Sequence, residues 1–198
     1  DKQKFPKSGL RHSDVDREIA MMQACKHPNL IRIYDTFVDE KSMSLALEYC
    51  DGGDFADKIR ELGLTLQEPE LHDWMRQVCS AVAVLHSMGI CHRDIKPDNF
   101  MVSCARNLKL CDFGLAIYAP AGRLLREKCG TPAYMAPEQH SLPESAGYWL
   151  PVDMWAAGVL MHVLMFGGQH PFLQRGQLNM QQLTRGELDF SGGQSTIF

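Results

Sequence analysis

The amino-acid sequence predicts an α+β fold in two unequal parts, a small part that contains strands and a larger part that is mainly helical. In the small part, Val15, Ile19 and Met22 keep the spacing of one helical face. Residues 29–34 and 43–47 alternate between apolar and polar side chains, which is typical of strands. We therefore expect a helix followed by two strands in residues 1–49.

The larger part, residues 50–198, is predicted to begin with a glycine-rich linker. Residues 50–54 read Cys-Asp-Gly-Gly-Asp, and paired glycines favour a turn. A helix follows, and Gly89 is placed to end it. Its apolar positions are Leu71, Trp74, Met75, Val78, Val82 and Leu85. The apolar stretch at residues 154–166 is too short to span a bilayer and indicates a buried helix.

The composition limits the classes of partner and compartment. Of the 198 residues, 45% are hydrophobic and 22% charged, which suits a soluble protein with a sizeable core. A net charge of −4 argues against nucleic acid or an anionic membrane as partner and allows a basic peptide. The seven cysteines form no CxxC pair, so we expect neither disulfides nor zinc, and a reducing, cytoplasmic compartment. Residues 1–7 are polar, so we expect no signal peptide there. The sequence does not indicate the oligomeric state.

The most informative segment is residues 92–99, which read His-Arg-Asp-Ile-Lys-Pro-Asp-Asn. This segment resembles the catalytic loop of eukaryotic-type protein kinases, H-R-D-x-K-x-x-N. The resemblance implies that Asp94 accepts the proton of the substrate hydroxyl and that Lys96 stabilises the transferred phosphoryl group. It also implies that Asn99 binds a magnesium ion.

A second motif, Asp-Phe-Gly, begins at Asp112, 18 residues after Asp94, which is the separation that the family uses. The resemblance implies that Asp112 binds the magnesium ion that bridges the phosphates of ATP, while Phe113 has a structural role. The tripeptide alone is a weak signal. At this distance from the catalytic loop, and after the strand-like residues 108–110, it is a strong one.

Residues 130–138, Gly-Thr-Pro-Ala-Tyr-Met-Ala-Pro-Glu, resemble the end of the activation segment of serine/threonine kinases rather than tyrosine kinases. The resemblance places Thr131 near Asp94, where it helps to define the substrate site; the alternative is a simple turn threonine. Glu138 closes the segment as a structural residue. Its usual arginine partner is expected in helices beyond residue 198.

Three further residues receive structural or regulatory roles from the resemblance. Asp153 is expected to accept hydrogen bonds from the backbone around His92 and Arg93, since a buried carboxylate needs such partners. Glu18 occupies the position of the helix glutamate that pairs with an ATP-anchoring lysine; the alternative is a surface glutamate. That lysine and a glycine-rich loop are expected upstream of residue 1, because Lys2 and Lys4 lie in a polar run rather than in an apolar strand.

The resemblance also nominates the nucleotide pocket and the substrate subsite. Backbone groups of Glu48 and Cys50 are implied to bind the adenine edge, with Leu47 as gatekeeper. The residues implied to line the pocket from below are Met101 and Cys111. Asp54 is placed to reach the ribose or a basic substrate residue.

The fold implied by the resemblance is bilobal, with a small β-rich lobe, incomplete here, and a larger helical lobe. The implied function is a serine/threonine protein kinase, most similar to the calcium/calmodulin-dependent group, that uses ATP and Mg²⁺ on protein substrates. The alternatives are a pseudokinase scaffold and a small-molecule phosphotransferase. Loss of Asp94, Asn99 or Asp112 would mark a pseudokinase, and all three are present.

The activation segment carries a charge where relatives carry a phosphorylated threonine. Between Asp112 and Gly130 the only hydroxyl side chain is Tyr118, and Glu127 stands three residues before Gly130. We expect Glu127 to form an ion pair with Arg93 that holds the segment open without phosphorylation. The alternative is a solvated glutamate among basic neighbours.

Overall fold

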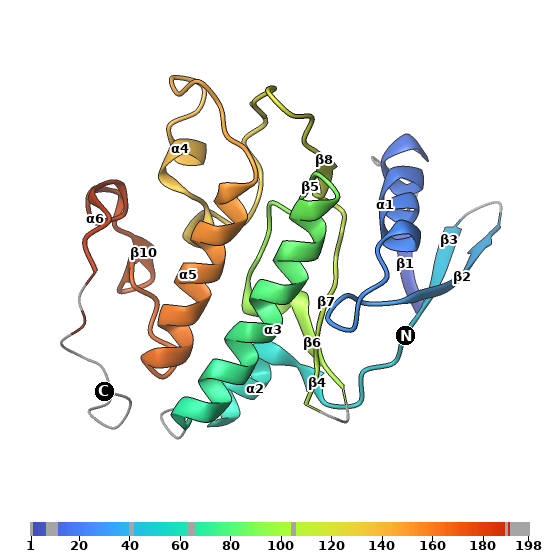
Figure 1. Cartoon of the computed structure of the whole chain (residues 1–198), viewed down its shortest axis with the longest axis horizontal. Helices are drawn as coiled ribbons and strands as arrows, with labels where there is room; N and C mark the ends of the chain where they lie inside the picture. The colour runs from blue at the N-terminus through green and yellow to red at the C-terminus, as the bar shows by residue number, and fades with distance from the viewer. Residues whose placement is uncertain are drawn as a thin grey trace.

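In the computed structural model, the larger part of the chain stands beside a small sheet with one helix (Figure 1). The structure describes residues 2–6, 12–39, 42–62, 66–103, 106–188 and 190. The predicted α+β organisation in two unequal parts is confirmed.

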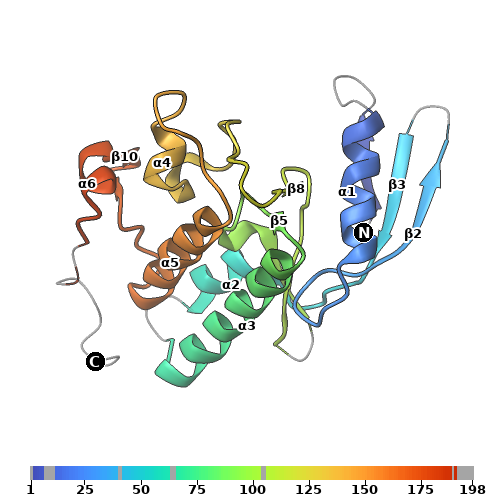
Figure 2. The same ribbon diagram turned by 45° about the horizontal axis from the view of Figure 1, so that its top comes forward.

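The small part is a three-stranded antiparallel sheet and one helix. Strand β3 (Ser42–Leu47) is central, between β1 (Lys2–Pro6) and β2 (Ile33–Val38). Helix α1 (His12–Ala24) runs alongside the sheet in both views (Figures 1 and 2). Met22 on its predicted apolar face is 4% exposed, so the period-3.6 pattern identified the buried side correctly.

The sequence analysis did not predict the strand that contains Lys2 and Lys4, which it described only as a polar run. Both belong to β1, whose backbone pairs with β3 in the register Lys2 with Ala46 and Lys4 with Ser44. A strand at a sheet edge is defined by backbone pairing, and lysine is well tolerated there. The polar run therefore hid a strand from an analysis based on apolar periodicity.

The first predicted strand, residues 29–34, is also misplaced. Strand β2 begins at Ile33, and residues 29–31 instead run beside the larger part. The amide of Ile31 donates to the carbonyl of Leu110, and the amide of Leu110 donates to the carbonyl of Asn29, both at 2.9 Å. Local alternation indicates an extended chain but does not identify the strand with which it pairs.

The larger part is built around two long helices and several short elements. Helix α3 (Glu68–Ser87) confirms the predicted helix and is followed by Gly89 at φ +70°, a conformation that favours glycine. Helix α5 (Pro151–Met165) confirms the second and has proline in its first turn. The remaining elements are β4 (Gly53–Asp54), α2 (Phe55–Leu62), β5 (Ile90–Cys91), η2 (Pro97–Asn99), β6 (Phe100–Val102), β7 (Leu108–Leu110), β8 (Ile117–Tyr118), η3 (Pro132–Tyr134), α4 (Pro137–His140), β9 (Leu173–Gln174), β10 (Gln177–Leu178) and α6 (Met180–Arg185).

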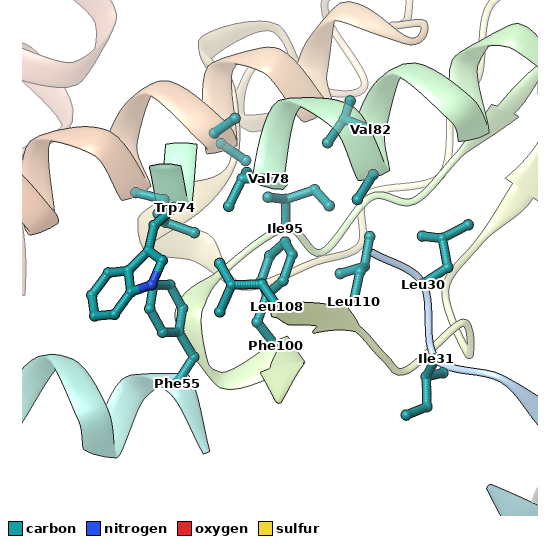
Figure 3. Close-up of a cluster of buried hydrophobic side chains, with 14 of the residues drawn as sticks. Leu30, Ile31, Phe55, Trp74, Val78, Val82, Ile95, Phe100, Leu108 and Leu110 are labelled. Atoms are coloured by element: carbon teal, nitrogen blue, oxygen red, sulfur yellow. The ribbon is translucent and has the colours of Figure 1, made fainter. Parts of the chain in front are cut away.

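The main core lies between α3 and the strands β6 and β7. Figure 3 shows Val78 and Val82 of α3 above Phe100, Leu108 and Leu110. All five side chains are buried, with exposures of 0%. Full burial of side chains of this size contributes about 1.5–3 kcal/mol each, so this layer is the main source of stability for the elements that carry the site.

A buried polar network joins the two parts. The Oε1 atom of Gln77 on α3 accepts hydrogen bonds from the Leu108 amide at 2.7 Å and from Asn29 Nδ2 at 2.9 Å. Gln77 Nε2 donates to Asp73 Oδ2 at 2.8 Å and to the Arg106 carbonyl at 3.3 Å. Since Gln77 is 2% exposed and its amide is fully engaged, the network fixes residue 29 to the larger part.

Within the described residues, no helix is long and apolar enough to cross a membrane.

Candidate active site

A cavity of about 430 Å³ opens where the small sheet meets the larger part. Its wall combines the end of β3, the linker that follows it, the segment after β7 and one face of α1. The lining residues are Glu18, Met22, Ile31, Leu45, Leu47, Glu48, Tyr49, Cys50, Asp98, Asn99, Met101, Cys111 and Asp112. Leu47, Cys50, Met101 and Cys111, all nominated from the sequence, thus surround one space.

Two nominated residues use their side chains elsewhere. The carboxylate of Glu48 pairs with Lys109 Nζ at 2.8 Å, which leaves only its backbone for a ligand in the cavity. Asp54 is not among the residues that line the cavity, and its Oδ1 accepts a hydrogen bond from the Ala56 amide at 2.8 Å at the start of α2. Its contact with a ribose or a basic substrate residue stays a prediction.

Asp94 is the most heavily hydrogen-bonded carboxylate of the predicted catalytic loop. Its Oδ1 accepts hydrogen bonds from the amide of Thr131 at 2.9 Å and from its hydroxyl at 2.7 Å. Its Oδ2 lies 2.9 Å from Lys96 Nζ and 2.9 Å from Asn99 Nδ2. The structure therefore brings Asp94 together with three other residues that the sequence singled out, Thr131, Lys96 and Asn99.

These contacts decide the charge of Asp94. Burial by itself raises the pKa of Asp94, and hydrogen bonds from Lys96, Thr131 and Asn99 outweigh it, so the pKa lies below its ordinary value. The group is thus a carboxylate near neutral pH. It can accept a hydrogen bond from a substrate hydroxyl and orient it, but it is a weak base on its own.

The loop that carries Asp94 is anchored from beneath by Asp153 of α5. The carboxylate of Asp153, 1% exposed, accepts hydrogen bonds from the amides of His92 at 2.9 Å and Arg93 at 2.8 Å. His86 Nε2 on α3 is a third partner at 2.9 Å, and the sequence analysis missed it. Arg93 has a φ of +69°, which is costly for arginine, so this anchor stabilises a strained backbone.

Asp112 lies at the rim of the cavity, directly after β7. It has a φ of +57°, and its Oδ1 accepts a hydrogen bond from the Gly114 amide at 3.2 Å. A Cβ on Gly114 would lie 3.2 Å from the same oxygen, so a side chain there would require the Asp112 carboxylate to shift by a few tenths of an ångström. Phe113 points into the core, where its ring meets that of His92 edge to face with 5.5 Å between centroids. The buried phenylalanine fixes the direction of the aspartate.

Glu18 of α1 faces the same cavity, 9% exposed. Burial raises its pKa to about 7, and the charge of Asp112 adds to the shift. The backbone N–H of Phe113 and the charge of Arg17 act in the opposite direction. The carboxylates of Glu18 and Asp112 line the same cavity and repel each other, so a cation between them is expected to be bound favourably.

The stability of the 198-residue chain is expected to fall as pH rises because of Glu18. A folded-state pKa of about 7 lies above the ordinary glutamate pKa of 4.5, so the contribution is complete below pH 4.5 and is lost as the pH rises past 7. We expect Glu18→Gln to remove a pH-dependent change of roughly 2–3 kcal/mol. Urea unfolding from pH 4.5 to 8 measures it, with the exposed Glu144→Gln as control. An unchanged pH profile in Glu18→Gln would contradict the assignment.

The predicted contact between Arg93 and Glu127 is present. Arg93 Nη1 donates to Glu127 Oε2 at 2.8 Å and to the Tyr148 hydroxyl at 3.3 Å, and its Nε donates to the Leu115 carbonyl at 2.7 Å. The Tyr148 hydroxyl in turn donates to the Glu127 carbonyl at 2.6 Å. No motif identifies Tyr148, which lies 21 residues further along the chain and binds the backbone carbonyl of Glu127.

Glu138 lies in the first turn of the short helix α4, at the end of the predicted activation segment. It is partly buried in α4, and its carbonyl accepts a hydrogen bond from the Ser145 hydroxyl at 2.9 Å. Thr131, earlier in the same segment, is hydrogen-bonded to Asp94. The segment is therefore fixed at Thr131 and again at Glu138.

Comparison with known proteins agrees with this geometry. The protein kinase domain family matches residues 2–191. CBL-interacting protein kinase 9 of Oryza sativa subsp. japonica is 38% identical over 164 residues, which is 80% of this chain and 35% of that protein. Serine/threonine-protein kinase DCLK3 of Mus musculus is 40% identical over 157 residues, 77% of this chain and 19% of that protein. CBL-interacting serine/threonine-protein kinase 3 of Arabidopsis thaliana is 36% identical over 194 residues, which is 96% of this chain and 43% of that protein.

The chain spans less than half the length of these three relatives. The family match nevertheless covers nearly all of it and includes the catalytic loop, the cavity and the activation segment described above. The relatives are named as protein kinases, two of them of the serine/threonine type. This chain therefore belongs to the protein kinase domain family, with the serine/threonine type that its motifs indicate.

Proposed function

We propose that the protein transfers the γ-phosphoryl group of ATP to serine or threonine hydroxyls of protein substrates. The observation that carries the proposal is the arrangement around Asp94. Its carboxylate is held by Thr131, Lys96 and Asn99, and Asn99 also lines the cavity whose rim carries Asp112. A hydroxyl acceptor, a cation and a nucleotide can therefore be bound within one site.

The residues present fit a nucleotide with magnesium. Mg²⁺ prefers oxygen ligands and usually keeps several waters, so one or two protein ligands and phosphate oxygens are sufficient. Asp112 offers a carboxylate, and Asn99 offers its Oδ1 because its Nδ2 already donates to Asp94. Over the described part of the chain, no group of three or more metal-ligating side chains occurs, in keeping with an ion that binds mainly to phosphate oxygens.

ATP with Mg²⁺ would supply the phosphoryl group and neutralise its charge. The chain's own residues orient the reaction. Asp94 would accept the hydrogen bond of the attacking hydroxyl, and Lys96, which also donates to Thr131 Oγ1 at 2.7 Å, would lie beside the transferred group. Backbone groups of Glu48 and Cys50 would position the adenine at the far end of the cavity.

A transfer assay tests this proposal. The full-length protein is expected to move labelled phosphate from γ-labelled ATP to serine and threonine peptides, but not to the matched alanine peptides. A protein that binds ATP without transferring phosphate would instead support the pseudokinase alternative.

The cellular compartment is proposed from the cysteines. The chain has seven cysteines, and the six that the structure describes are free thiols, which suits a reducing, cytoplasmic compartment.

We expect a modest preference for peptide substrates that carry an arginine on the N-terminal side of the phosphorylated residue. Asp98 is exposed on the cavity wall, and Asp54 lies close by at the start of α2. Exposed ion pairs are weak, so a peptide array should show about a two- to fivefold preference for arginine over alanine. Selection of acidic upstream residues would contradict this prediction.

We further propose that the Arg93–Glu127 contact holds the activation segment in place without phosphorylation. Phosphatase treatment is therefore expected to leave activity unchanged. Glu127→Ala should lower activity severalfold, since it removes the charge-assisted hydrogen bond to the buried guanidinium of Arg93. The effect stays modest because the Glu127 side chain is 69% exposed. Glu144→Ala, an exposed acidic residue outside this contact, is the control. Loss of wild-type activity to phosphatase would overturn the proposal.

A further inference from the structure

A second cavity, of about 690 Å³, lies under the activation segment and has no part in the proposed reaction. It is bounded by β8 on one side and by residues 120–127 on the other. The residues that line it are Arg93, Ile117, Tyr118, Pro120, Gly122, Arg123, Leu124, Leu125, Arg126, Glu127 and Ala146. Three arginines thus face one glutamate, in a chain whose net charge is −4.

Two of these arginines are available to a ligand. Arg93 is already bound by Glu127, Tyr148 and the Leu115 carbonyl. Arg123 and Arg126 are exposed, and no carboxylate of the described residues forms a salt bridge with either one. Guanidinium groups bind phosphate through charge-assisted, often bidentate hydrogen bonds.

The backbone between the two arginines is fixed. Leu125, which separates them, exchanges two backbone hydrogen bonds with Tyr148, at 2.8 and 2.9 Å. The amide of Arg123 donates to the Pro120 carbonyl at 3.1 Å, which closes a turn. Binding of an anion would therefore order mainly side chains, and the loss of conformational entropy would be small.

Tyr118 lines the same cavity. It lies on β8, paired with Ile90, and is 48% exposed. Between Phe113 and Cys129 it is the only residue with a hydroxyl side chain, so a phosphoryl ester in this stretch can form only there. The strand holds its backbone while the ring stays accessible to a modifying enzyme.

We propose that Arg123 and Arg126 form a phosphoryl-binding site and that phosphorylated Tyr118 is its occupant. A tyrosine-directed kinase with ATP would make the modification. The phenolic oxygen forms a bond to the γ-phosphorus, the bond from that phosphorus to the bridging oxygen breaks, ADP leaves, and the phenolic proton passes to a base of that enzyme. The product carries close to two negative charges opposite two unneutralised guanidinium groups.

Free phosphate has the same binding chemistry, but the ester has an advantage. A phosphoryl group attached to Tyr118 is held at the cavity at a high effective concentration, whereas inorganic phosphate must be captured from solution. The modification would add to the Arg93–Glu127 contact rather than replace it. The site does not depend on phosphoryl transfer by this chain, so its test needs no activity measurement.

The test compares the full chain with and without phosphotyrosine incorporated at position 118 during translation. Phosphorylation is expected to raise the melting temperature by about 2–6 °C and to slow tryptic cleavage after the exposed Lys128, a site that both arginine variants keep, about fivefold or more. Both effects should disappear in Arg123→Gln/Arg126→Gln. They should persist in Arg175→Gln/Arg185→Gln, a pair of exposed arginines outside the cavity.

The remaining outcomes overturn the proposal in distinguishable ways. If phosphorylated and unmodified chains melt and digest alike, the site does not exist. If the two arginine pairs have equal effects, the response is one of net charge. If inorganic phosphate alone protects the unmodified chain as strongly as the ester does, and Arg123→Gln/Arg126→Gln removes that protection, the site binds a free anion and Tyr118 is not its source.

Discussion

Replacement of Asp112 by asparagine is expected to abolish phosphoryl transfer and leave the fold intact. Asp112 is the carboxylate at the cavity rim, and Asn99 is its only proposed companion as a magnesium ligand. Because Asn99 is neutral, the change removes the only charged ligand and with it stabilisation that is needed most in the transition state, and a fall of about a thousandfold in turnover is expected. Because Asp112 is exposed, the melting temperature should change little.

The measurement is steady-state transfer from ATP to a serine peptide by the full-length protein, beside circular dichroism melting. Asp51→Asn is the matched control, since Asp51 is an exposed carboxylate next to the same cavity but outside its lining. Near-normal turnover in Asp112→Asn would sink the assignment of the site. Asp94→Asn should be comparably damaging, because it leaves the acceptor hydroxyl without its hydrogen-bond acceptor.

Asp153→Asn should have the largest effect on the structure of the catalytic loop. The native carboxylate accepts hydrogen bonds from His92, Arg93 and His86, whereas the asparagine amide would present a donor to at least one of these donors. A buried donor left without an acceptor costs about 1–3 kcal/mol, and the strained Arg93 backbone would relax in addition. We expect a loss of roughly 2–4 kcal/mol in the free energy of unfolding.

The same change should lower turnover, since Asp94 follows directly on the two anchored residues. Denaturant unfolding and peptide phosphorylation are measured on the same preparation. Asp57→Asn serves as control, because that carboxylate pairs with Arg60 on the surface of α2 and its side chain is 64% exposed. If Asp153→Asn unfolds and turns over as the control does, the carboxylate does not hold the loop.

The residues that we propose for catalysis could be nominated from the sequence because their signal is local. Residues 92–99 and 112–114 are short continuous motifs, and the cavity brings them together with the pocket residues nominated alongside them. Helix α3 was predictable for the same reason, since its buried face repeats with the helical period over 20 residues.

What could not be predicted depends on partners distant in the chain. His86 and Tyr148 carry no motif, and their roles come only from the residues that the fold places beside them. Strand β1 is polar, and its identity comes from pairing with β3. Residues 29–31 looked like a strand of the small sheet, and their true neighbour, Leu110, is 79 to 81 positions further along the chain.

The network around Gln77 has a mechanical consequence. It holds Asn29, close after the C-terminal end of α1, against the larger part, and Glu18 lies seven residues before Cys25, the residue that directly follows the helix. At 1.5 Å per residue that length is about 10 Å, so α1 acts as a lever whose fulcrum is at its C-terminal end. A rotation of about 10° about the fulcrum displaces Glu18 by roughly 2 Å, more than a hydrogen bond tolerates. A small tilt of one helix therefore suffices to bring a carboxylate into or out of register with a cation in the cavity.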